Sequence, residues 1–209
     1  MASRRSPSQP TAVRGRPRSQ RARQAILDAT RALVDKGGYA AATIEAIASR
    51  SGVAKTTIYR WWPNRPTLVV DLLMDMAAKD VPPPTGPDPL KAIRTEMRGI
   101  AAASDHVMGR LLVSLVGEAQ HDPEIRAALH DRLFDPRTEA TGKMIQAAQT
   151  AGLLRKDMPA HVAVDLLVGP LFYRMLVQHR PLTETFVSQV FRGVMTGLAK
   201  PRRAATRKR

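Results

Sequence analysis

Two short amphipathic segments joined at a single glycine, within residues 43–62, constrain the fold of this chain more than any other feature of its sequence. Thr43 is a plausible N-cap for the first segment. Residues at helical spacing predict a buried face behind it: Ile44, Ile47, Ala48 and Ser51. Gly52 follows at once and suits a tight turn that needs a positive φ. A second helix is predicted over about 55–62, so the pair is typical of a helix-turn-helix unit.

The second helix carries a polar outward face. Its inward neighbours, such as Ile58, are apolar, whereas the remaining positions hold donors and amphipathic aromatics: Lys55, Thr56, Thr57, Tyr59, Arg60 and Trp61. Hydroxyls and a lysine near a helix N-terminus suit phosphates and base edges, because the N–H groups there already point at the anion. Arg65, at the start of the next helix, adds a further backbone contact. The alternative is an ordinary helix pair with a solvated polar face.

The rest of the chain carries helix signals and no alternating apolar pattern long enough for a sheet. We therefore predict an all-α protein of about nine helices. Four precede the Pro/Gly-rich stretch 81–88: 21–36, 44–51, 55–62 and 65–79. Beyond it, three helices are expected to start at Asp88-Pro89, Ser104-Asp105 and Asp122-Pro123, and the third of these is broken or kinked at Pro136. Two more helices are expected over 159–178, with an interruption at Gly169-Pro170, and over 183–198.

Charge is concentrated at the two ends. The formal net charge is +15, with seven arginines and no acid in residues 1–23 and six Lys or Arg and no acid in residues 200–209. The body is nearly neutral, so the tails suggest a polyanionic partner, since each docked cation releases a condensed counterion. For the C-terminal tail, unspecific charge is an equal alternative. The predicted organisation is a flexible basic arm (1–20), a DNA-binding domain (21–80, with its connecting helix 65–79), a helical domain (81–199) and a basic tail (200–209).

The N-terminal arm contains Arg14-Gly15-Arg16-Pro17-Arg18. This segment resembles the core of an AT-hook, in which a flat Gly-Arg-Pro lies in a narrow A·T minor groove. It immediately precedes the first helix, so Arg14, Arg16 and Arg18 are placed to reach the minor groove beside the reading head. The alternative is a generic basic arm that contacts the backbone only.

Three stretches together resemble the DNA-binding domain of the TetR/AcrR family of bacterial regulators: residues 43–48 (TIEAIA), 52–59 (GVAKTTIY) and 64–68 (NRPTL). The match runs from about Arg21 to Leu73 and is specific in order and spacing. Residues 165–174 (DLLVGPLFYR) resemble one branch of the family. The resemblance implies a homodimer, a repressor in most members, that leaves double-stranded operator DNA when a small molecule binds the C-terminal domain.

The same resemblance assigns individual roles. Thr43 caps the second helix and faces phosphate, Tyr59 is the phosphate-binding tyrosine, and Arg65 replaces a lysine. Two positions depart from the family: Trp61 stands where a histidine is common, and Ala54 where a serine cap is common. Trp61 keeps a phosphate contact through its indole N–H in this interpretation, and Ala54 leaves the recognition helix without its side-chain cap. Trp62 occupies a core aromatic position.

The C-terminal half is expected to hold the dimer interface and the effector site. The last two helices carry wide apolar faces, and the dimerisation candidates are Gly169, Phe172, Val187, Val190, Phe191 and Val194. The effector is not readable from the sequence. Candidate lining residues are Met97, Met108, Leu111, Leu112 and Met144, with Glu118, Tyr173 and Arg174 as polar anchors, and each methionine is also an ordinary core residue.

Several classes of protein are disfavoured. The chain has no cysteine, no Gly-rich phosphate loop, no nucleophile elbow and no His-Glu-x-x-His, so we expect neither an enzyme nor a metal or cofactor site. His161 and Asp165 share a helix face, but two ligands do not make a metal site. The longest apolar stretches are far shorter than a membrane span and no secretory signal is recognisable, which favours a cytoplasmic protein. The alternative is a basic architectural or RNA-binding protein without a ligand switch, which the apolar C-terminal half disfavours.

Overall fold

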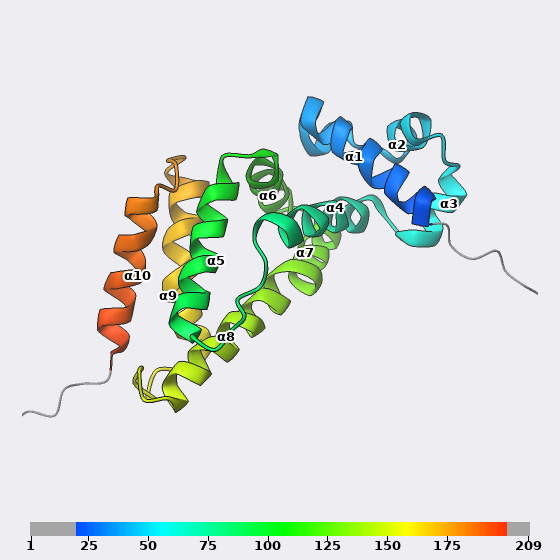
Figure 1. Ribbon diagram of the computed structural model, residues 1–209. Helices are drawn as coiled ribbons and strands as arrows, with labels where there is room; N and C mark the ends of the chain where they lie inside the picture. The colour runs from blue at the N-terminus through cyan, green and yellow to red at the C-terminus, as the bar shows by residue number, and fades with distance from the viewer. Residues whose placement is uncertain (1–19, 200–209) are drawn as a thin grey trace, which may run out of the picture.

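The computed structural model describes residues 20–199, and within this range the protein is all-α, as predicted (Figure 1). The π-helical turn η1 joins α7 to α8 and η2 extends α9, so residues 20–199 form nine helical segments, of which α1 is kinked at Gly37 and Gly38. The bounds are α1 Gln20–Ala41, α2 Ile44–Ser51, α3 Lys55–Trp61, α4 Arg65–Asp80, α5 Pro89–Ser104, α6 Val107–Glu118, α7 Pro123–Leu129, η1 His130–Phe134, α8 Asp135–Thr150, α9 Ala160–Phe172, η2 Tyr173–Val177 and α10 Glu184–Leu198.

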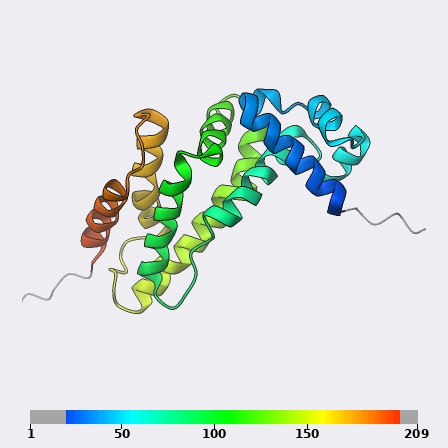
Figure 2. The ribbon, with the colours of Figure 1, turned by 45° about the horizontal axis from the view of Figure 1, so that its top comes forward.

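The first three helices and the last two lie at opposite ends of the molecule. Helices α1, α2 and α3 gather at one end, and α9 and α10 lie at the other (Figures 1 and 2). Helix α4 leads from the first group toward the middle, where it packs against α6, α7 and η1. The predicted DNA-binding unit and the predicted dimer helices therefore lie at opposite ends, with α4 between them.

Polar caps fix most helix starts, as the sequence predicts. The side chains of Thr43, Asn64 and Thr183 each accept a hydrogen bond from a backbone N–H in the first turn that follows. Asp88 and Asp122 do the same ahead of Pro89 and Pro123. The prediction for Ser104-Asp105 was wrong, because α5 continues through Ser104 and α6 is preceded by His106, which gives no side-chain cap. The Ser104 hydroxyl instead donates to the carbonyl of Ala101 within α5.

Two apolar cores hold the described chain together. The first joins α1–α4 to α6, α7 and η1, and its fully buried members include Ile26, Trp62 and Leu115. The second joins α5 to α8, α9 and α10 around residues such as Ile93 and Leu171. Helices α6 and α7 thus share a core with the DNA-binding helices, although they follow the Pro-rich stretch 81–88 in sequence. The domain division at residue 81 stays a prediction.

Both helix-interrupting prolines are accommodated without a break. Pro136 lies in the first turn of α8, directly after η1, where the Asp135 N–H bonds to the His130 carbonyl five residues back. Pro170 lies inside α9, which continues to Phe172 and passes into η2. Proline cannot donate the ladder hydrogen bond, and one wide turn nearby lets the chain continue as a helix. The predicted kink and interruption are therefore replaced by π-helical turns.

Candidate DNA-binding surface and ligand cavity

The recognition helix α3 presents the polar face that its sequence predicts. Ile58 is completely buried against the first core, whereas Lys55, Thr56 and Arg60 are exposed and Tyr59 is 50% exposed. Thr57 and Trp61 are half-buried. Gly52 ends α2 with φ 68°, which is the left-handed turn expected there. Ala54 precedes α3 without a side-chain cap, also as expected. Four of the predicted contact residues of α3 are therefore exposed and two are half-buried, and Thr43, at the start of α2, is also half-buried.

The Lys55 ammonium has an acidic partner inside the protein. Its Nζ lies 2.6 Å from Glu45 Oε1, which connects the start of α3 to α2. The hydrogen bond from Lys55 holds the pKa of Glu45 below its usual range, so this carboxylate is ionised at neutral pH. Both side chains are exposed. An anion approaching Lys55 would therefore compete with Glu45 for its ammonium group.

Arg65 is held on an aromatic ring. Its Nε donates to the Tyr39 hydroxyl at 3.1 Å, and its guanidinium carbon lies 4.0 Å from the centre of the Tyr39 ring. Burial raises the pKa of Tyr39, an effect that the neighbouring Arg65 partly offsets. This contact fixes Arg65, at the start of α4, against the end of α1.

Trp62 anchors the end of α3 to α4. Its ring is 1% exposed, so the predicted core position is confirmed. The indole Nε1 donates to Asp71 Oδ2 of α4 at 2.7 Å. Asp71 also pairs with Arg132 of η1, and more distantly with Arg23 of α1 at 3.7 Å. A single carboxylate thus connects the recognition helix, the connecting helix and η1.

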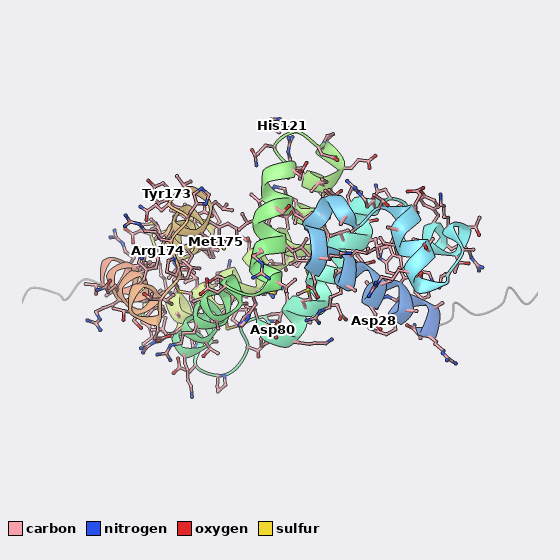
Figure 3. The ribbon with its side chains drawn as sticks, turned by 90° about the horizontal axis from the view of Figure 1, so that it is seen from above. Asp28, Asp80, His121, Tyr173, Arg174 and Met175 are labelled. Carbon is pink, nitrogen blue, oxygen red and sulfur yellow. The ribbon has the colours of Figure 1, made fainter. Side chains whose placement is uncertain are left out.

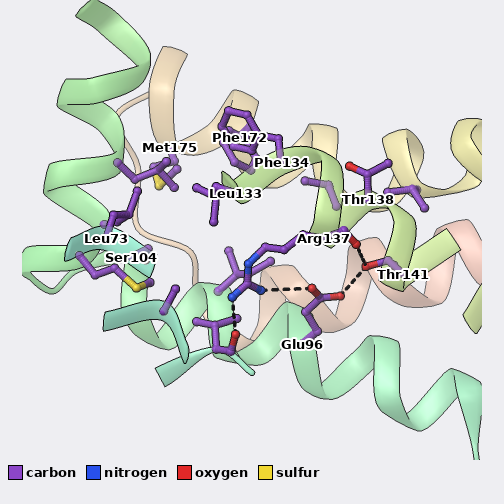
Figure 4. Close-up of a pocket in the computed structure, with 18 residues that line it drawn as sticks. Leu73, Glu96, Ser104, Leu133, Phe134, Arg137, Thr138, Thr141, Phe172 and Met175 are labelled. Atoms are coloured by element: carbon purple, nitrogen blue, oxygen red, sulfur yellow. Dashed lines mark hydrogen bonds and ion pairs between the residues drawn. The ribbon is translucent and has the colours of Figure 1, made fainter. Parts of the chain in front are cut away.

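A cavity of about 100 Å³ lies between α4, α5, α6, η1, α8 and the α9–η2 rod (Figure 4). Leu73 and Ala77 of α4 form part of its wall, and so do Met108 and Leu112 of α6, which were predicted to line an effector site. Both π-helical turns border it: Leu133 and Phe134 come from η1, and Met175 comes from η2. Pi-helical turns are frequent at functional sites. The cavity is therefore the candidate effector site.

Three linked polar side chains, the buried Glu96 and Thr141 and the half-buried Arg137, form part of an otherwise mainly apolar wall. The Glu96 carboxylate accepts hydrogen bonds from Thr141 Oγ1 at 2.8 Å and from Arg137 Nη1 at 3.3 Å (Figure 4). Arg137 Nη2 donates to the Val81 carbonyl. Burial raises the pKa of Glu96, and the bonds from Thr141 and Arg137 oppose this shift. Sequence reasoning missed all three, although Glu96 lies at helical spacing from Ile93 and Ile100 on an otherwise apolar face.

The other predicted effector contacts lie outside the cavity lining. Met97 and Leu111 are buried in the two cores, and Met144 packs against the second. Glu118 is exposed at the end of α6. Tyr173 is 56% exposed on η2, Arg174 lies on the side of η2 that faces α10, and Met175 points toward the middle of the molecule (Figure 3). Arg174 donates to the Pro181 carbonyl at 2.9 Å and stacks on Phe186. As effector contacts these six residues stay predictions without support from the cavity.

The residues predicted to form the dimer interface differ in how far they are exposed. Gly169 is exposed, with no atom within 4 Å of the position its Cβ would take. Val187 is completely buried inside the protomer, so it has no face left for a partner. Val190, Phe191 and Val194 are half-buried against their own core, and Phe172 lines the cavity. The largest exposed apolar side chains nearby are instead on the α9–η2 rod: Leu166, Tyr173 and Val177.

That rod is apolar enough to require a further explanation. Residues 160–177 pass a length and composition test for a membrane span, with a mean hydropathy of 1.4 and 22% of the window buried. The longest apolar stretches were predicted to be far shorter than a membrane span, whereas residues 160–177 form one continuous helical segment across Gly169-Pro170. Core helices of soluble proteins pass the same test, so a single such helix is weak evidence for a membrane. Among residues 20–199, no cluster of three His, Asp or Glu is placed to hold a metal ion.

The arginines of the N-terminal arm, Arg14, Arg16 and Arg18, and the basic tail from Lys200 onward lie outside the described residues.

Comparison with known proteins identifies the family. A family model described as bacterial regulatory proteins of the tetR family matches residues 26–72, and one described as a tetracyclin repressor-like C-terminal domain matches residues 82–194. The chain belongs to the TetR family. Members of this family are DNA-binding transcription regulators rather than enzymes, and they bind operator DNA as dimers that respond to small-molecule effectors. The architectural alternative is not favoured.

Individual relatives agree with this assignment. The HTH-type transcriptional regulator YdeS of Bacillus subtilis is 29% identical over 88% of this chain and 93% of its own length. The HTH-type transcriptional repressor KstR of Rhodococcus jostii is 33% identical over 70% of this chain and 82% of its own. Among solved structures, the TetR family regulator SCO0332 superposes with a TM-score of 0.73 at 27% identity, covering 87% of this chain and all of that one. The chain is accordingly a ligand-responsive, DNA-binding transcriptional regulator.

Proposed function

We propose that this regulator is a homodimeric cytoplasmic repressor, without catalytic activity, that a small molecule releases from its operator by entering the cavity beside α4. The observation that carries the proposal is the position of α4. Near its start, Leu68 and Val69 are buried in the core of the DNA-binding helices, and further along Leu73 and Ala77 line the cavity. One rigid helix therefore touches both sites, so a displacement in the cavity reorients the reading head.

The operator contacts follow from the exposed face of α3 and the residues beside it. The residues that contact DNA in this proposal are Thr43, Lys55, Thr56, Thr57, Tyr59, Arg60, Trp61 and Arg65, and Arg14, Arg16 and Arg18 reach the adjacent minor groove. Exposure of Lys55, Tyr59 and Arg60 on one face supports it. Phosphate contacts set the register of the helix on the duplex, and base-edge contacts provide sequence preference.

A second connection runs from the cavity through η1. Leu133 and Phe134 line the cavity, and the preceding Arg132 pairs with Asp71, which holds the Trp62 indole at the end of α3. A ligand that displaces η1 therefore moves the group that positions the recognition helix. This route adds to the contact of Met108 and Leu112 with α4.

The dimer interface is proposed on the exposed face of the α9–η2 rod. Leu166, Tyr173 and Val177 are 44%, 56% and 61% exposed, although they are large and apolar. Gly169 on the same rod, and Gly193 and Gly197 on α10, have open space where a Cβ would be, which permits close approach of a second copy's helices. A two-fold axis here places two reading heads at the far ends, about one DNA turn (~34–36 Å) apart.

The interface is tested by replacing one exposed residue. Leu166→Asp introduces a charge into the proposed contact and should give monomers by light scattering, with operator affinity lower by about 10²-fold or more because bivalent binding is lost. Gln146→Asp adds the same charge at an exposed position of α8 and should stay dimeric. A Leu166→Asp protein that remains dimeric would place the interface elsewhere.

The switch is tested by reciprocity. Operator DNA is selected from random-sequence duplexes by the protein itself, and a ligand is found by thermal shift. A coupling of about 1–3 kcal/mol predicts that ligand lowers operator affinity about 5–150-fold and that operator lowers ligand affinity by the same factor. Equal ligand affinities with and without operator would exclude that ligand as an effector. If every ligand behaved so, the proposal of a release mechanism would fail.

A further inference from the structure

The cavity has a mixed character that restricts what it binds. Its wall is mainly apolar, and apart from Ser104 and Thr138 the polar lining residues meet at one place, where Glu96 of α5 contacts Arg137 and Thr141 of α8. The side chains of Glu96 and Arg137 are 6% and 18% exposed. A ligand in the cavity therefore lies against both members of a largely buried ion pair, rather than against a single charge.

We propose that the effector is an uncharged, mainly apolar molecule with one hydroxyl group, which accepts a hydrogen bond from Arg137 and donates one to Glu96. This rests on the proposed function in taking the cavity as the effector site. The opposite charges of Glu96 and Arg137 already balance. An anionic or cationic ligand would leave an uncompensated charge in a poorly hydrated site, which is strongly unfavourable.

The hydrogen-bond geometry leaves room for such a hydroxyl. Arg137 meets Glu96 at 3.3 Å through one nitrogen, longer than the about 2.7–2.9 Å of a tight charge-assisted pair. Within residues 20–199, Arg137 uses Nη1 and Nη2 for Glu96 and the Val81 carbonyl, out of five N–H donors that a guanidinium carries. Each Glu96 oxygen accepts a bond from one side chain, Arg137 or Thr141, and retains a lone pair. A hydroxyl is both donor and acceptor, so it can bridge a free donor of Arg137 and a free lone pair of Glu96 without displacing the existing bonds.

The cavity volume sets the size of the first probes. At about 100 Å³ it approaches the 150 Å³ or so that accommodates benzene in an engineered apolar cavity. We therefore choose four compounds built on one benzene ring and one carbon substituent: toluene, benzyl alcohol, benzoate and benzylammonium. They differ in polarity and charge and very little in shape, so differences in affinity report on Glu96 and Arg137.

The test measures the dissociation constants of the four compounds for the full chain without DNA, by ligand-observed nuclear magnetic resonance at pH 7. Benzyl alcohol should bind at least about tenfold more tightly than toluene, because it gains hydrogen bonds to charged groups. It should also bind at least about tenfold more tightly than benzoate or benzylammonium. Equal binding of toluene and benzyl alcohol, tighter binding of either ion, or binding of none of the four would overturn the proposal.

Two variants change the net charge of the Glu96–Arg137 pair. Glu96→Gln leaves Arg137 as the unbalanced charge, so the preference should move from benzyl alcohol to benzoate. The double variant Glu96→Gln/Arg137→Gln restores neutrality and should return the preference to benzyl alcohol. An unchanged order of affinities in Glu96→Gln would contradict the role of the pair, and thermal melting of each variant verifies that it folds.

The affinities of the four compounds test the ligand chemistry of the cavity separately from the release of operator DNA. Binding of benzyl alcohol that leaves operator affinity unchanged would refute the proposed function of the cavity and leave its ligand chemistry intact. Conversely, a charged effector that releases operator through this cavity would support the release mechanism and overturn the ligand class.

Discussion

The proposed DNA-binding surface and the candidate effector cavity are built in opposite ways. The surface comes from one continuous stretch, residues 43–65, whose polar side chains face solvent on a helix fixed by Ile58 and Trp62. The cavity is assembled from six parts of the chain, and its polar groups are enclosed by apolar ones. The first is readable from local spacing because neighbours in sequence are neighbours in space. The second depends on which distant helices meet.

The largest expected effect is a difference in stability between variants of the two adjacent tryptophans, Trp61 and Trp62. Trp62 is 1% exposed, so Trp62→Ala should lower the free energy of unfolding by about 3–5 kcal/mol, the usual cost of deleting a large buried side chain. Trp61 is half-buried, and Trp61→Ala should cost much less stability while weakening operator binding. Denaturant titration and DNA binding measure the two. Similar losses of stability in both variants would mean that the two rings are not divided between core and surface.

The second effect concerns Asp71, which connects the DNA-binding helices to the η1 turn beside the cavity. Asp71→Asn removes the charge that Arg132 and Arg23 share and should lower stability by about 1–2 kcal/mol. It should also reduce the factor by which ligand lowers operator affinity. Asp75→Asn, one turn later on α4, removes a partner of exposed Lys79 and is the matched control. If Asp71→Asn and Asp75→Asn show the same ligand coupling as the original protein, the signal passes through α4 packing alone.

A smaller effect tests the competition for Lys55. Lys55→Ala should weaken binding uniformly across DNA sequences and lower the salt slope by about one, as loss of one phosphate contact requires. Glu45→Gln removes the competing carboxylate and its repulsion of phosphate, so it should strengthen binding by roughly two- to fivefold, the scale of an exposed ion pair. In the double variant the benefit of Glu45→Gln should shrink. A Glu45→Gln protein that binds DNA more weakly would assign the ion pair a supporting role instead.

The smallest effect is a pH dependence inside the cavity. The folded-state pKa of Glu96 is raised above 4.5, so between 4.5 and that raised value the folded protein binds more protons than the unfolded chain. Stability should therefore fall as pH rises through this window. The slope of unfolding free energy against pH should be less negative in Glu96→Gln than in the original protein. Identical slopes by denaturant titration would show that Glu96 does not contribute.

The contrast also explains what the sequence alone could reveal. Thr43, Gly52 and Ala54 behave as predicted because capping and turn geometry depend on a few adjacent residues. Asp105 was mistaken for a cap because its spacing resembled Asp88 and Asp122, which precede a proline, whereas Asp105 does not. Tertiary contacts determine the remainder. The signal for the cavity pair was present in Glu96, a charged residue at an apolar-spaced position, but its partner Arg137 lies 41 residues away.

The turn η1 contains one residue more than an α-helical path would use, and its wide hydrogen bonding absorbs that residue without changing the relative phase of α7 and α8. An α-helix advances about 100° per residue, so winding all five residues of η1 as α-helix would rotate α8 by about that angle relative to α7. Arg137 would then leave the cavity side, and the residues after it would face different neighbours. Deleting one residue of η1 would instead give a regular helix with α8 still in phase. The position of Arg137 in the cavity thus depends on the wide turn itself.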